Sequence, residues 1–228
     1  MEDKIYIMAD MKLIIPPRHL MTKTNDEDPV FFHYYPIARI VYRKRLKNTL
    51  SLIPEGKKYK NVLEIGYGSG IFLPTLAELA ETVTALDIHP ETEAVGKLLD
   101  FYHIRNRVKL ISGDIMNMPF EDSVFDCCVI VSTLENIENS EQAVSEIARV
   151  VKPGGDIIIS FPVENFITDA LFRIAGEDPR KIHPSNHRYI LEYLKKNFTV
   201  TRSIHFPSFV PLNMSLYVSL HCRNDVLK

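Results

Sequence analysis

The sequence has few cysteines, no long hydrophobic run and no excess of charge of either sign. Its three cysteines, Cys127, Cys128 and Cys222, lack the spacing of metal ligands, so we expect a reducing compartment and no disulfide framework. No apolar stretch approaches the length of a membrane span, and the first residues, MEDKIYIMAD, lack the apolar core of a signal peptide. These absences predict a cytoplasmic protein.

Positive and negative charges nearly balance. The chain has 27 Lys and Arg against 29 Asp and Glu, a net charge of -2, so general affinity for nucleic acid is not expected. Residues 39–60 are the local exception, because their only acid is Glu55 and eight of them are basic. This segment is either a solvated helix face followed by a loop, or a patch that makes weak contact with a membrane surface or an anionic substrate.

The 228 residues are enough to bury a core, and their pattern divides the chain into two parts. Residues 1–54 are an N-terminal appendage, with a short strand at residues 4–9 and a helix over residues 29–53 that Pro36 either begins or breaks. Residues 55–228 alternate short apolar strands with amphipathic helices. The expected apolar stripe of the N-terminal helix consists of Ile37, Ile40, Val41 and Leu50.

The second part predicts an α/β fold with a doubly wound, seven-stranded and mostly parallel sheet. Strands are expected at residues 61–65, 82–88, 108–115, 125–133, 156–162, 198–206 and 213–221, and helices at residues 71–81, 90–104, 140–151, 165–175 and 186–196. Pro153, Gly154 and Gly155 are expected to stop the helix before the fifth strand. The last two strands, which a short loop joins, predict an antiparallel hairpin at the C-terminal edge of the sheet.

A glycine-rich turn follows the first predicted strand in VLEIGYGSG, residues 62–70. Glycine occurs where a backbone turns sharply or approaches another group closely, and here that group could be a phosphate, another ligand or a packed helix. The spacing G-x-G-x-G differs from the G-x-G-x-x-G of dinucleotide-binding folds. Glu64, two residues before Gly66, would repel a pyrophosphate but suits a cationic ligand.

Carboxylates also close the next two predicted strands. Asp87 follows Glu64 by 23 residues and can accept hydrogen bonds from ribose hydroxyls. Asp114 ends the third strand and points to the same edge of the sheet. Either aspartate could instead cap the following helix. Three acids at three successive strand ends, with a glycine turn at the first, nevertheless predict a ligand site there.

With these motifs the chain resembles the class I S-adenosylmethionine-dependent methyltransferases, specifically the broad small-molecule group. The resemblance covers residues 61–162, and the fold it implies is Rossmann-like. The matching segments are VLEIGYGSG, ALDIHP, SGDIMNMPFEDSVFDCCVIVSTLENIEN and EIARVVKPGGDIIISFP. They are specific for the cofactor, S-adenosylmethionine, and uninformative about the acceptor, which is expected to be a small molecule or a lipid.

The resemblance implies a role for each matching position. The methionine end of the cofactor would be held by Glu64 and the turn residues Gly66, Tyr67, Gly68 and Gly70. The ribose would bind Asp87, and the adenine would lie among Ile88, Asp114 and Ile115. The sulfonium would lie near Ser132 and Thr133.

No general base stands out in the sequence. Relatives often have a histidine in Leu-Glu-His after the fourth strand, but this chain has Asn136 there, so Glu135 is the remaining candidate, unless it only caps the next helix. His183 and His187 lie where relatives cover the acceptor, and they could serve as base, bind substrate or make ordinary loop contacts. Pro184 between them argues against a helix that presents both, so no metal site is expected.

The aromatic residues before the first strand include Tyr34 and Tyr35. In relatives the N-terminal helix often forms a lid over cofactor and acceptor, so these two tyrosines are candidate substrate contacts. They could equally pack only against the sheet.

Three other functions remain compatible with the sequence. The first is methyl transfer to a protein or nucleic acid, although the Asn-Pro-Pro-Tyr motif of many such enzymes is replaced by Ser-Thr-Leu-Glu. The second is a nucleotide-dependent oxidoreductase. The third is a non-catalytic, methyltransferase-like partner protein, which predicts damaged cofactor residues, whereas Glu64, Asp87 and Asp114 are all present.

Overall fold

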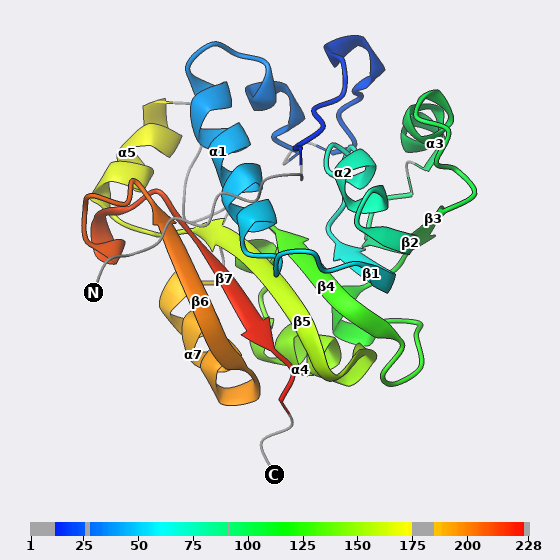
Figure 1. Ribbon diagram of the computed structural model, residues 1–228. Helices are drawn as coiled ribbons and strands as arrows, with labels where there is room; N and C mark the ends of the chain where they lie inside the picture. Colours follow the sequence, from blue (N-terminus) through cyan, green and yellow to red (C-terminus); the bar gives the residue numbers. More distant parts are fainter. Residues whose placement is uncertain (1–11, 26–27, 91, 175–184, 226–228) are drawn as a thin grey trace.

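A seven-stranded sheet forms the centre of the structure (Figure 1). The computed structural model describes residues 12–25, 28–90, 92–174 and 185–225. The strands are β1 Tyr59–Ile65, β2 Ala80–Asp87, β3 Val108–Ser112, β4 Phe125–Val131, β5 Val151–Pro162, β6 Thr199–Phe206 and β7 Tyr217–Arg223. Their order across the sheet is β3-β2-β1-β4-β5-β7-β6.

One strand runs against the others. Strands β3, β2, β1, β4 and β5 pair in parallel, whereas β7 is antiparallel to both of its neighbours, β5 and β6. The predicted doubly wound, mostly parallel sheet and its antiparallel C-terminal hairpin are therefore confirmed. Because β7 lies between β5 and β6, the outer edge of the sheet is β6.

Helices cover both faces of the sheet, as the alternating pattern predicts. They are α1 Ala38–Ser51, α2 Leu73–Ala77, α3 Thr92–Phe101, α4 Ser140–Val150, α5 Phe166–Ile174 and α7 His187–Asn197. Short 3-10 turns are η1 Arg18–Leu20, η2 Val30–His33, η3 Ile115–Asn117, η4 Leu134–Asn136 and η5 Leu212–Met214. None of the helices in the described part of the chain is long and apolar enough to cross a membrane.

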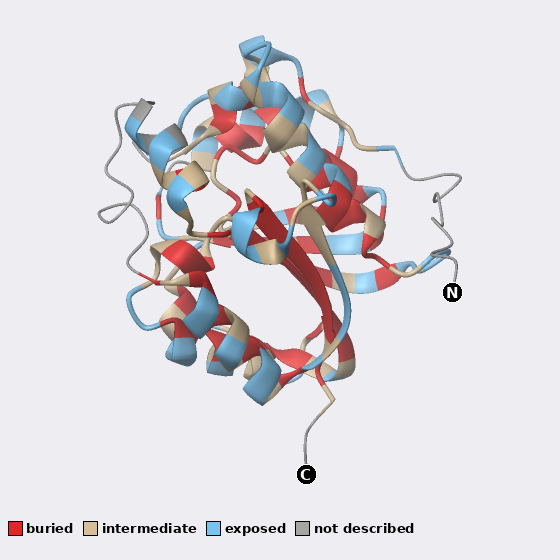
Figure 2. Cartoon of the chain, turned by 90° about the vertical axis from the view of Figure 1, so that its left-hand side faces the viewer, coloured by how far each residue is buried: buried red, intermediate tan, exposed pale blue. Residues whose placement is uncertain are grey.

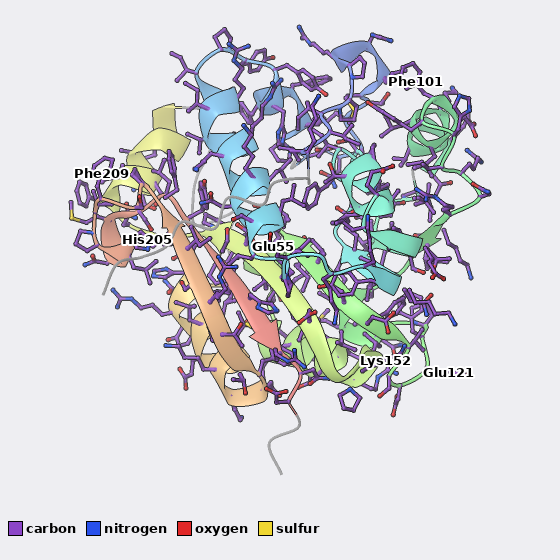
Figure 3. All side chains as sticks on the ribbon, viewed as in Figure 1. Glu55, Phe101, Glu121, Lys152, His205 and Phe209 are labelled. Carbon is purple, nitrogen blue, oxygen red and sulfur yellow. The ribbon has the colours of Figure 1, made fainter. Side chains whose placement is uncertain are left out.

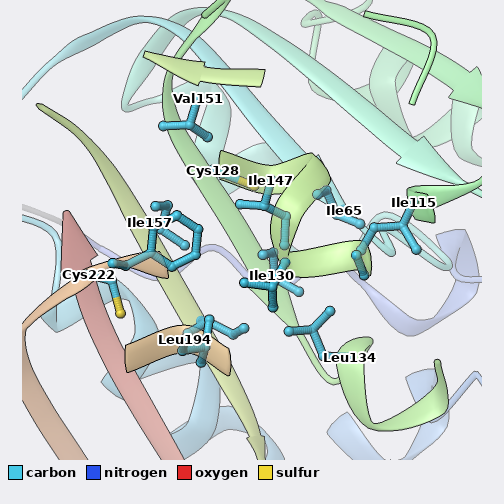
Figure 4. Packing of buried hydrophobic residues seen from close by; sticks show 14 of the residues in the cluster. Ile65, Ile115, Cys128, Ile130, Leu134, Ile147, Val151, Ile157, Leu194 and Cys222 are labelled. Atoms are coloured by element: carbon cyan, nitrogen blue, oxygen red, sulfur yellow. The ribbon is translucent and has the colours of Figure 1, made fainter. Parts of the chain in front are cut away.

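The hydrophobic core lies in two layers, one on each face of the sheet. Cys128 and Ile130 of β4 belong to the layer under α4 and α7 (Figure 4), whereas Cys127 and Val129 belong to the layer under α1, α2 and α3. This alternation follows from the two-residue period of a strand, and it explains why β4 is apolar on both faces. Figure 2 shows the buried strands between helices whose outer sides are exposed.

The N-terminal helix is shorter than expected. Proline 36 marks a break, because Val30–His33 form η2 and the α-helix begins only at Ala38. The apolar stripe predicted for this helix is wrong in the first half of α1, since Ile37 is 83% exposed and Ile40 is 63% exposed. The buried residues of α1 all lie in its second half, and they are Leu46, Asn48, Thr49 and Leu50. The short strand expected at residues 4–9 falls outside the described residues.

The helix expected over residues 71–81 is also shorter. It is α2 only as far as Ala77, and β2 begins at Ala80. The reason is strand pairing, because Ala80 lies opposite Tyr59 at the start of β1. A short turn, in which the amide of Leu79 donates to the carbonyl of Leu76, connects the two elements.

The stop expected from Pro153–Gly155 is wrong. Helix α4 ends earlier, at Val150, and the three residues lie within β5. The pairing of β4 with β5 shifts register between Phe125 and Cys127, so the proline and glycines are accommodated in a bulge instead of a loop. Gly154 has a φ of +72°, a value that glycine adopts at little cost.

Candidate functional site

The site expected at the carboxyl ends of the strands lies where β1 ends between β2 and β4. Glu64, the penultimate residue of β1, is in register with Ala85 of β2 and Val129 of β4. The chain order of the strands reverses at β1, because β2 and β3 follow on one side and β4 and β5 on the other. Ligands of open α/β sheets bind at such a reversal.

The glycine turn after β1 is held in a conformation that favours glycine. The φ angles are +74° at Gly66, +48° at Gly68 and +76° at Gly70. A Cβ atom on Gly66 would lie 2.1 Å from Oγ1 of Thr133, and one on Gly70 would lie 2.8 Å from Cγ1 of Val95. Gly68 differs, because the nearest atoms to its added Cβ, in the carboxylate of Asp28, would lie 3.7 Å away, an ordinary contact distance. Close packing thus explains two of the three glycines, and at Gly68 a side chain would meet no overlap.

Asp87 at the end of β2 faces the glycine turn. Its Oδ2 accepts a hydrogen bond of 2.8 Å from the amide of Gly68, and its Oδ1 accepts one of 3.3 Å from the amide of His89. The ring of His89 donates from Nε2 to the carbonyl of Gly68 over 3.1 Å. Asp87 therefore ties β2 to the turn, and the remaining lone pairs of its carboxylate stay available to a ligand.

Glu64 is a buried acid with an unpaired oxygen. The residue is 4% exposed, and its Oε2 has no hydrogen-bond partner among the described residues. Burial, together with the nearby carboxylate of Asp87, raises the pKa of Glu64 to about 8. Leaving a buried acceptor unpaired costs about 1–3 kcal/mol, so the arrangement is explained only if another group pairs with it.

Tyr67, at the tip of the turn, is likewise buried with an unpaired polar atom. Its ring packs edge-on against that of His89, with 4.9 Å between centroids, and its hydroxyl has no partner within the described structure. Burial and the acids Asp87 and Glu64 raise the pKa of Tyr67 to about 12. The hydroxyl therefore stays protonated and can donate to a ligand.

The predicted adenine-side residues lie beyond β2 and β3. Ile88 is 74% exposed beside Asp87, whereas Ile115 is buried. Asp114 does not end β3, which stops at Ser112, and its Oδ1 accepts a hydrogen bond of 2.8 Å from the amide of Met116. Asp114 is thus the N-cap of η3, which is the capping role that the sequence left open.

Ser132 and Thr133 follow β4 directly. Thr133 packs on Gly66, and its hydroxyl donates to the carbonyl of Ile65 over 3.2 Å, so it connects the ends of β4 and β1. Ser132 has a φ of +55°, which is uncommon and strained for a residue with a side chain. Its hydroxyl accepts a hydrogen bond from the guanidinium of Arg45.

Glu135, the candidate base, is buried one turn further on. It is 3% exposed and its Oε2 has no partner among the described residues. Burial raises its pKa to about 7, against the opposing effects of Arg45 and the hydroxyl of Ser132. Glu135 lies in η4, and the helix that follows is capped by Asn139, whose side chain accepts from the amide of Gln142. The alternative that Glu135 is only the cap of that helix is therefore wrong.

His187 is the N-terminal residue of α7. Its Nδ1 accepts a hydrogen bond of 3.2 Å from the amide of Glu164, and burial, with Arg188 nearby, lowers its pKa. The nearby Asn186 donates to the carboxylate of Glu164 over 2.7 Å. His187 thus already has a structural partner. His183 lies outside the described residues.

Tyr34 and Tyr35 lie in the N-terminal segment. The hydroxyl of Tyr34 donates to the carbonyl of Pro16 over 2.6 Å, so it ties two parts of this segment together. Tyr35 is 46% exposed, and the guanidinium of Arg18 lies 5.9 Å from its ring.

Two residues at the site were not predicted. Asp28 lies beside Gly68 and accepts hydrogen bonds from the amides of Thr24 and Val30, which brings the N-terminal segment over the glycine turn. Arg45 reaches the end of β4 from α1. Neither has a sequence signal, because Arg45 stands in a run of surface cations and Asp28 in a polar stretch.

The fold is a doubly wound α/β fold, and the candidate site lies at its reversal of strand order. A sequence model of a protein family described as "Methyltransferase domain" matches residues 63–159. A crystal structure of the N-methyltransferase NodS from Bradyrhizobium japonicum WM9 in complex with S-adenosylhomocysteine is similar, with a TM-score of 0.63 and 20% identity over 88% of this chain and 93% of that one. Residues 63–159 are therefore similar to a methyltransferase domain, and the fold is the Rossmann-like class I methyltransferase fold.

Curated relatives carry methyltransferase names. A sterol 4-C-methyltransferase of Caenorhabditis elegans is 28% identical over 161 residues, which are 60% of this chain and 48% of that protein. A demethylmenaquinone methyltransferase of Corynebacterium glutamicum is 34% identical over 157 residues, 66% of this chain and 64% of that protein. The chain thus spans about half of the length of the first relative and a little under two thirds of the second.

Proposed function

We propose that the chain transfers a methyl group from S-adenosylmethionine to a small organic molecule or a lipid. The observation that carries the proposal is Glu64, a buried carboxyl with an unpaired oxygen beside the glycine turn. The cofactor has an ammonium and a sulfonium, which this carboxylate would attract, whereas it would repel a diphosphate. The names of the relatives, one with a sterol and one with a quinone precursor as acceptor, agree with a lipid-like acceptor.

The residues present fit the cofactor. In the proposal, Glu64 pairs with the ammonium, and the backbone of Gly66, Tyr67, Gly68 and Gly70 lines the methionine end. Asp87 accepts hydrogen bonds from the ribose, for which its free lone pairs suffice. The adenine is placed against exposed Ile88, with Asp114 and Ile115 beside it, and the sulfur near Ser132 and Thr133.

Positioning is the main task of the protein in this reaction. The bound cofactor supplies a methyl carbon that the positive sulfur activates, and catalysis then requires an acceptor atom held in line with it. Thr133 fixes the end of β4 against Gly66, so the two strand ends keep one geometry. In the proposal, the described part of residues 1–54 acts as a lid over the domain of residues 55–228, with Asp28 beside Gly68 and Arg45 against Ser132. Tyr34 and Tyr35 of the lid are the proposed acceptor contacts of this segment.

Binding of S-adenosylhomocysteine, measured by calorimetry, tests the cofactor. Asp87→Asn is expected to weaken the affinity by about 1–3 kcal/mol, because one charge-assisted acceptor is lost while the shape is kept. Glu121→Gln, a change at an exposed acid far from the glycine turn (Figure 3), is the control and should leave the affinity unchanged. An unaltered dissociation constant in Asp87→Asn would refute the ribose assignment. Binding of NADH in place of S-adenosylhomocysteine would show an oxidoreductase.

We also propose that the start of α1 makes weak contact with membranes that contain acidic lipids. Ile37 and Ile40 are 83% and 63% exposed, next to the exposed cations Arg39 and Lys44. Two other cations of the basic segment are engaged within the protein, since Arg43 donates to the carbonyl of His33 and Arg45 to Ser132. The first half of α1 therefore presents exposed isoleucines together with the exposed cations Arg39 and Lys44, the combination that favours a membrane surface.

The double variant Ile37→Ser/Ile40→Ser is expected to reduce binding to vesicles of phosphatidylcholine and phosphatidylserine by about tenfold, since two apolar side chains no longer enter the lipid. Sedimentation with the vesicles measures the bound fraction. Phe101→Ser, on the outer side of α3 and 52% exposed, is the matched control (Figure 3). Equal losses in both variants, or no loss, would rule out this contact.

The proposed location is the cytoplasm. Cys127, Cys128 and Cys222 are buried and free, a state that a reducing compartment maintains.

A further inference from the structure

Unpaired buried polar atoms gather under α1. Among the described residues, seven buried side-chain atoms lack a hydrogen-bond partner, and two of them, on Glu64 and Tyr67, belong to the proposed cofactor site. The other five are Nδ1 of His33, Nε of Arg45, Oε2 of Glu135, Oδ1 of Asn136 and the hydroxyl of Tyr217. We call these five residues, with Ser132, the Arg45 cluster.

Arg45 is the centre of this cluster. Its guanidinium donates to the hydroxyl of Ser132 and lies 4.9 Å from the centre of the Tyr42 ring. It also acts electrostatically on Glu135 and Tyr217, which come from the loop after β4 and from the start of β7. Three separate elements thus direct polar groups toward one place, at the carboxyl-end edge of the sheet.

The cation and the acid of the cluster are not paired with each other. Arg45 and Glu135 are both described and form no ion pair, and Glu135 keeps one oxygen unpartnered although it is 3% exposed. The hydroxyl of Ser132 joins them instead, because it accepts from Arg45 and hydrogen-bonds the carboxylate of Glu135. Nε of Arg45 and Oε2 of Glu135 still have no partner among the described residues, and each such buried atom costs about 1–3 kcal/mol, so a bound group that pairs with both atoms would be stabilised there.

The cluster adjoins the proposed methyl donor site. Ser132 precedes Thr133, whose side chain packs on Gly66 of the glycine turn. Tyr217 pairs with Pro162, the last residue of β5, and therefore lies at the same edge. A group bound by Arg45 and Glu135 is thus on the acceptor side of the site.

The charges of the cluster restrict what can bind. A protonated amine would be repelled by Arg45, and a carboxylate would meet the carboxylate of Glu135. A neutral hydroxyl suits both, because it donates to Glu135 and places its oxygen near Arg45. We propose, on the basis of the proposed methyl transfer, that Arg45 and Glu135 bind the acceptor and select one with an ionisable hydroxyl, a phenol or an enol.

The reaction that follows is balanced without a further reagent. The hydroxyl proton passes to Glu135, and the electron pair of the O–H bond stays on the acceptor, where Arg45 stabilises the oxyanion. This pair, on oxygen or on a conjugated carbon, forms the bond to the methyl carbon, and the pair of the carbon–sulfur bond leaves with sulfur. The raised pKa of Glu135, about 7, suits a base at neutral pH. The charged groups facing Glu135 are Arg45 of α1 and Glu164 after β5.

Binding of 4-nitrophenol to the protein saturated with S-adenosylhomocysteine tests the proposal, because its absorption reports ionisation of the bound phenol. Arg45→Gln removes a positive neighbour, so it should raise the pKa of the bound phenol by about one unit. Glu135→Gln removes the negative charge that Glu135 carries above pH 7, so it should lower the pKa of the bound phenol. Arg45→Lys keeps the positive charge, so the pKa of the bound phenol should stay close to that in the unchanged protein. Lys47→Gln, the loss of another exposed cation of α1, is the matched control and should leave the pKa of the bound phenol unchanged.

Three results overturn the proposal. One is the absence of 4-nitrophenol binding to protein that does bind S-adenosylhomocysteine. Another is an equal shift of the phenol pKa, in the same direction, in Arg45→Gln and Glu135→Gln. The third is tighter binding of benzylamine or benzoate than of the phenol. Melting temperatures of all variants show whether each is folded, and the Arg45→Lys result stands even if Arg45→Gln unfolds. Failure to bind S-adenosylhomocysteine at all would instead refute the proposed function.

Discussion

Glu64→Gln is expected to stabilise the fold above pH 8 while it weakens cofactor binding. In the folded protein, burial and the neighbouring Asp87 raise the pKa of Glu64 from 4.5 to about 8. The folded state therefore holds a proton that the unfolded chain releases between these two values. Stability falls as pH rises through this window, by about 1.4 kcal/mol for each pH unit. Glutamine has no proton to lose, so the variant keeps its stability at alkaline pH.

The measurement compares melting temperatures of the two proteins at pH 4 and pH 9. At pH 4, where Glu64 is largely protonated in both states, the two should melt at similar temperatures, and at pH 9 the variant should melt several degrees higher. Glu55→Gln, at an exposed acid, controls for the loss of one charge. A difference that is independent of pH would show that Glu64 does not titrate with a raised pKa.

Cofactor binding should release the proton that Glu64 holds in the folded protein. If Glu64 pairs with the ammonium of S-adenosylhomocysteine, binding at pH 7 releases close to one proton, so affinity increases with pH up to about 8. Calorimetry in two buffers with different heats of ionisation measures this release directly. Glu64→Gln should lose both the release and most of the affinity. Heats that are equal in the two buffers would contradict the pairing.

Much of the fold follows from local sequence. Strand β4 is apolar at successive positions, and it lies in the middle of the sheet with Cys127 and Cys128 facing opposite layers of the core. Such a pattern depends only on burial from two sides, which the sequence records directly. The ends of the elements were less predictable. Helix α2 stops at Ala77 because Ala80 already pairs with β1, and a pairing partner 21 residues away leaves no mark on the local pattern.

The strand-end acids were predictable for a related reason. Glu64 and Asp87 lie at the ends of parallel strands, and topology alone brings these ends to one edge. Arg45 was not predictable, because α1 is far from β4 in sequence and its direction depends on tertiary packing. The apolar stripe expected through Ile37 and Ile40 was wrong for the same reason, since only the second half of α1 is buried. In the sequence, Arg45 could not be distinguished from the seven other cations of residues 39–60.

The glycine turn itself yields the second large effect. Gly66→Ala is expected to destabilise the fold by about 3 kcal/mol, because two penalties add. Alanine at a φ of +74° costs about 1–2 kcal/mol of backbone strain. Its Cβ would also lie 2.1 Å from Oγ1 of Thr133, an overlap worth about 1–3 kcal/mol. The backbone has little freedom to move away, since the amide of Gly66 donates to the carbonyl of Leu86 over 2.8 Å.

Gly56→Ala separates these penalties. Gly56 has a similar φ of +69°, but an added Cβ there would meet no atom within 4 Å, so its variant should show the strain alone. Urea unfolding of both variants gives the two free energies. Adding Thr133→Ala to Gly66→Ala removes the two closest atoms, and we expect the double variant to recover part of the loss relative to the sum of the single changes. Equal destabilisation by Gly66→Ala and Gly56→Ala would show that strain, and not contact with Thr133, requires glycine at this turn.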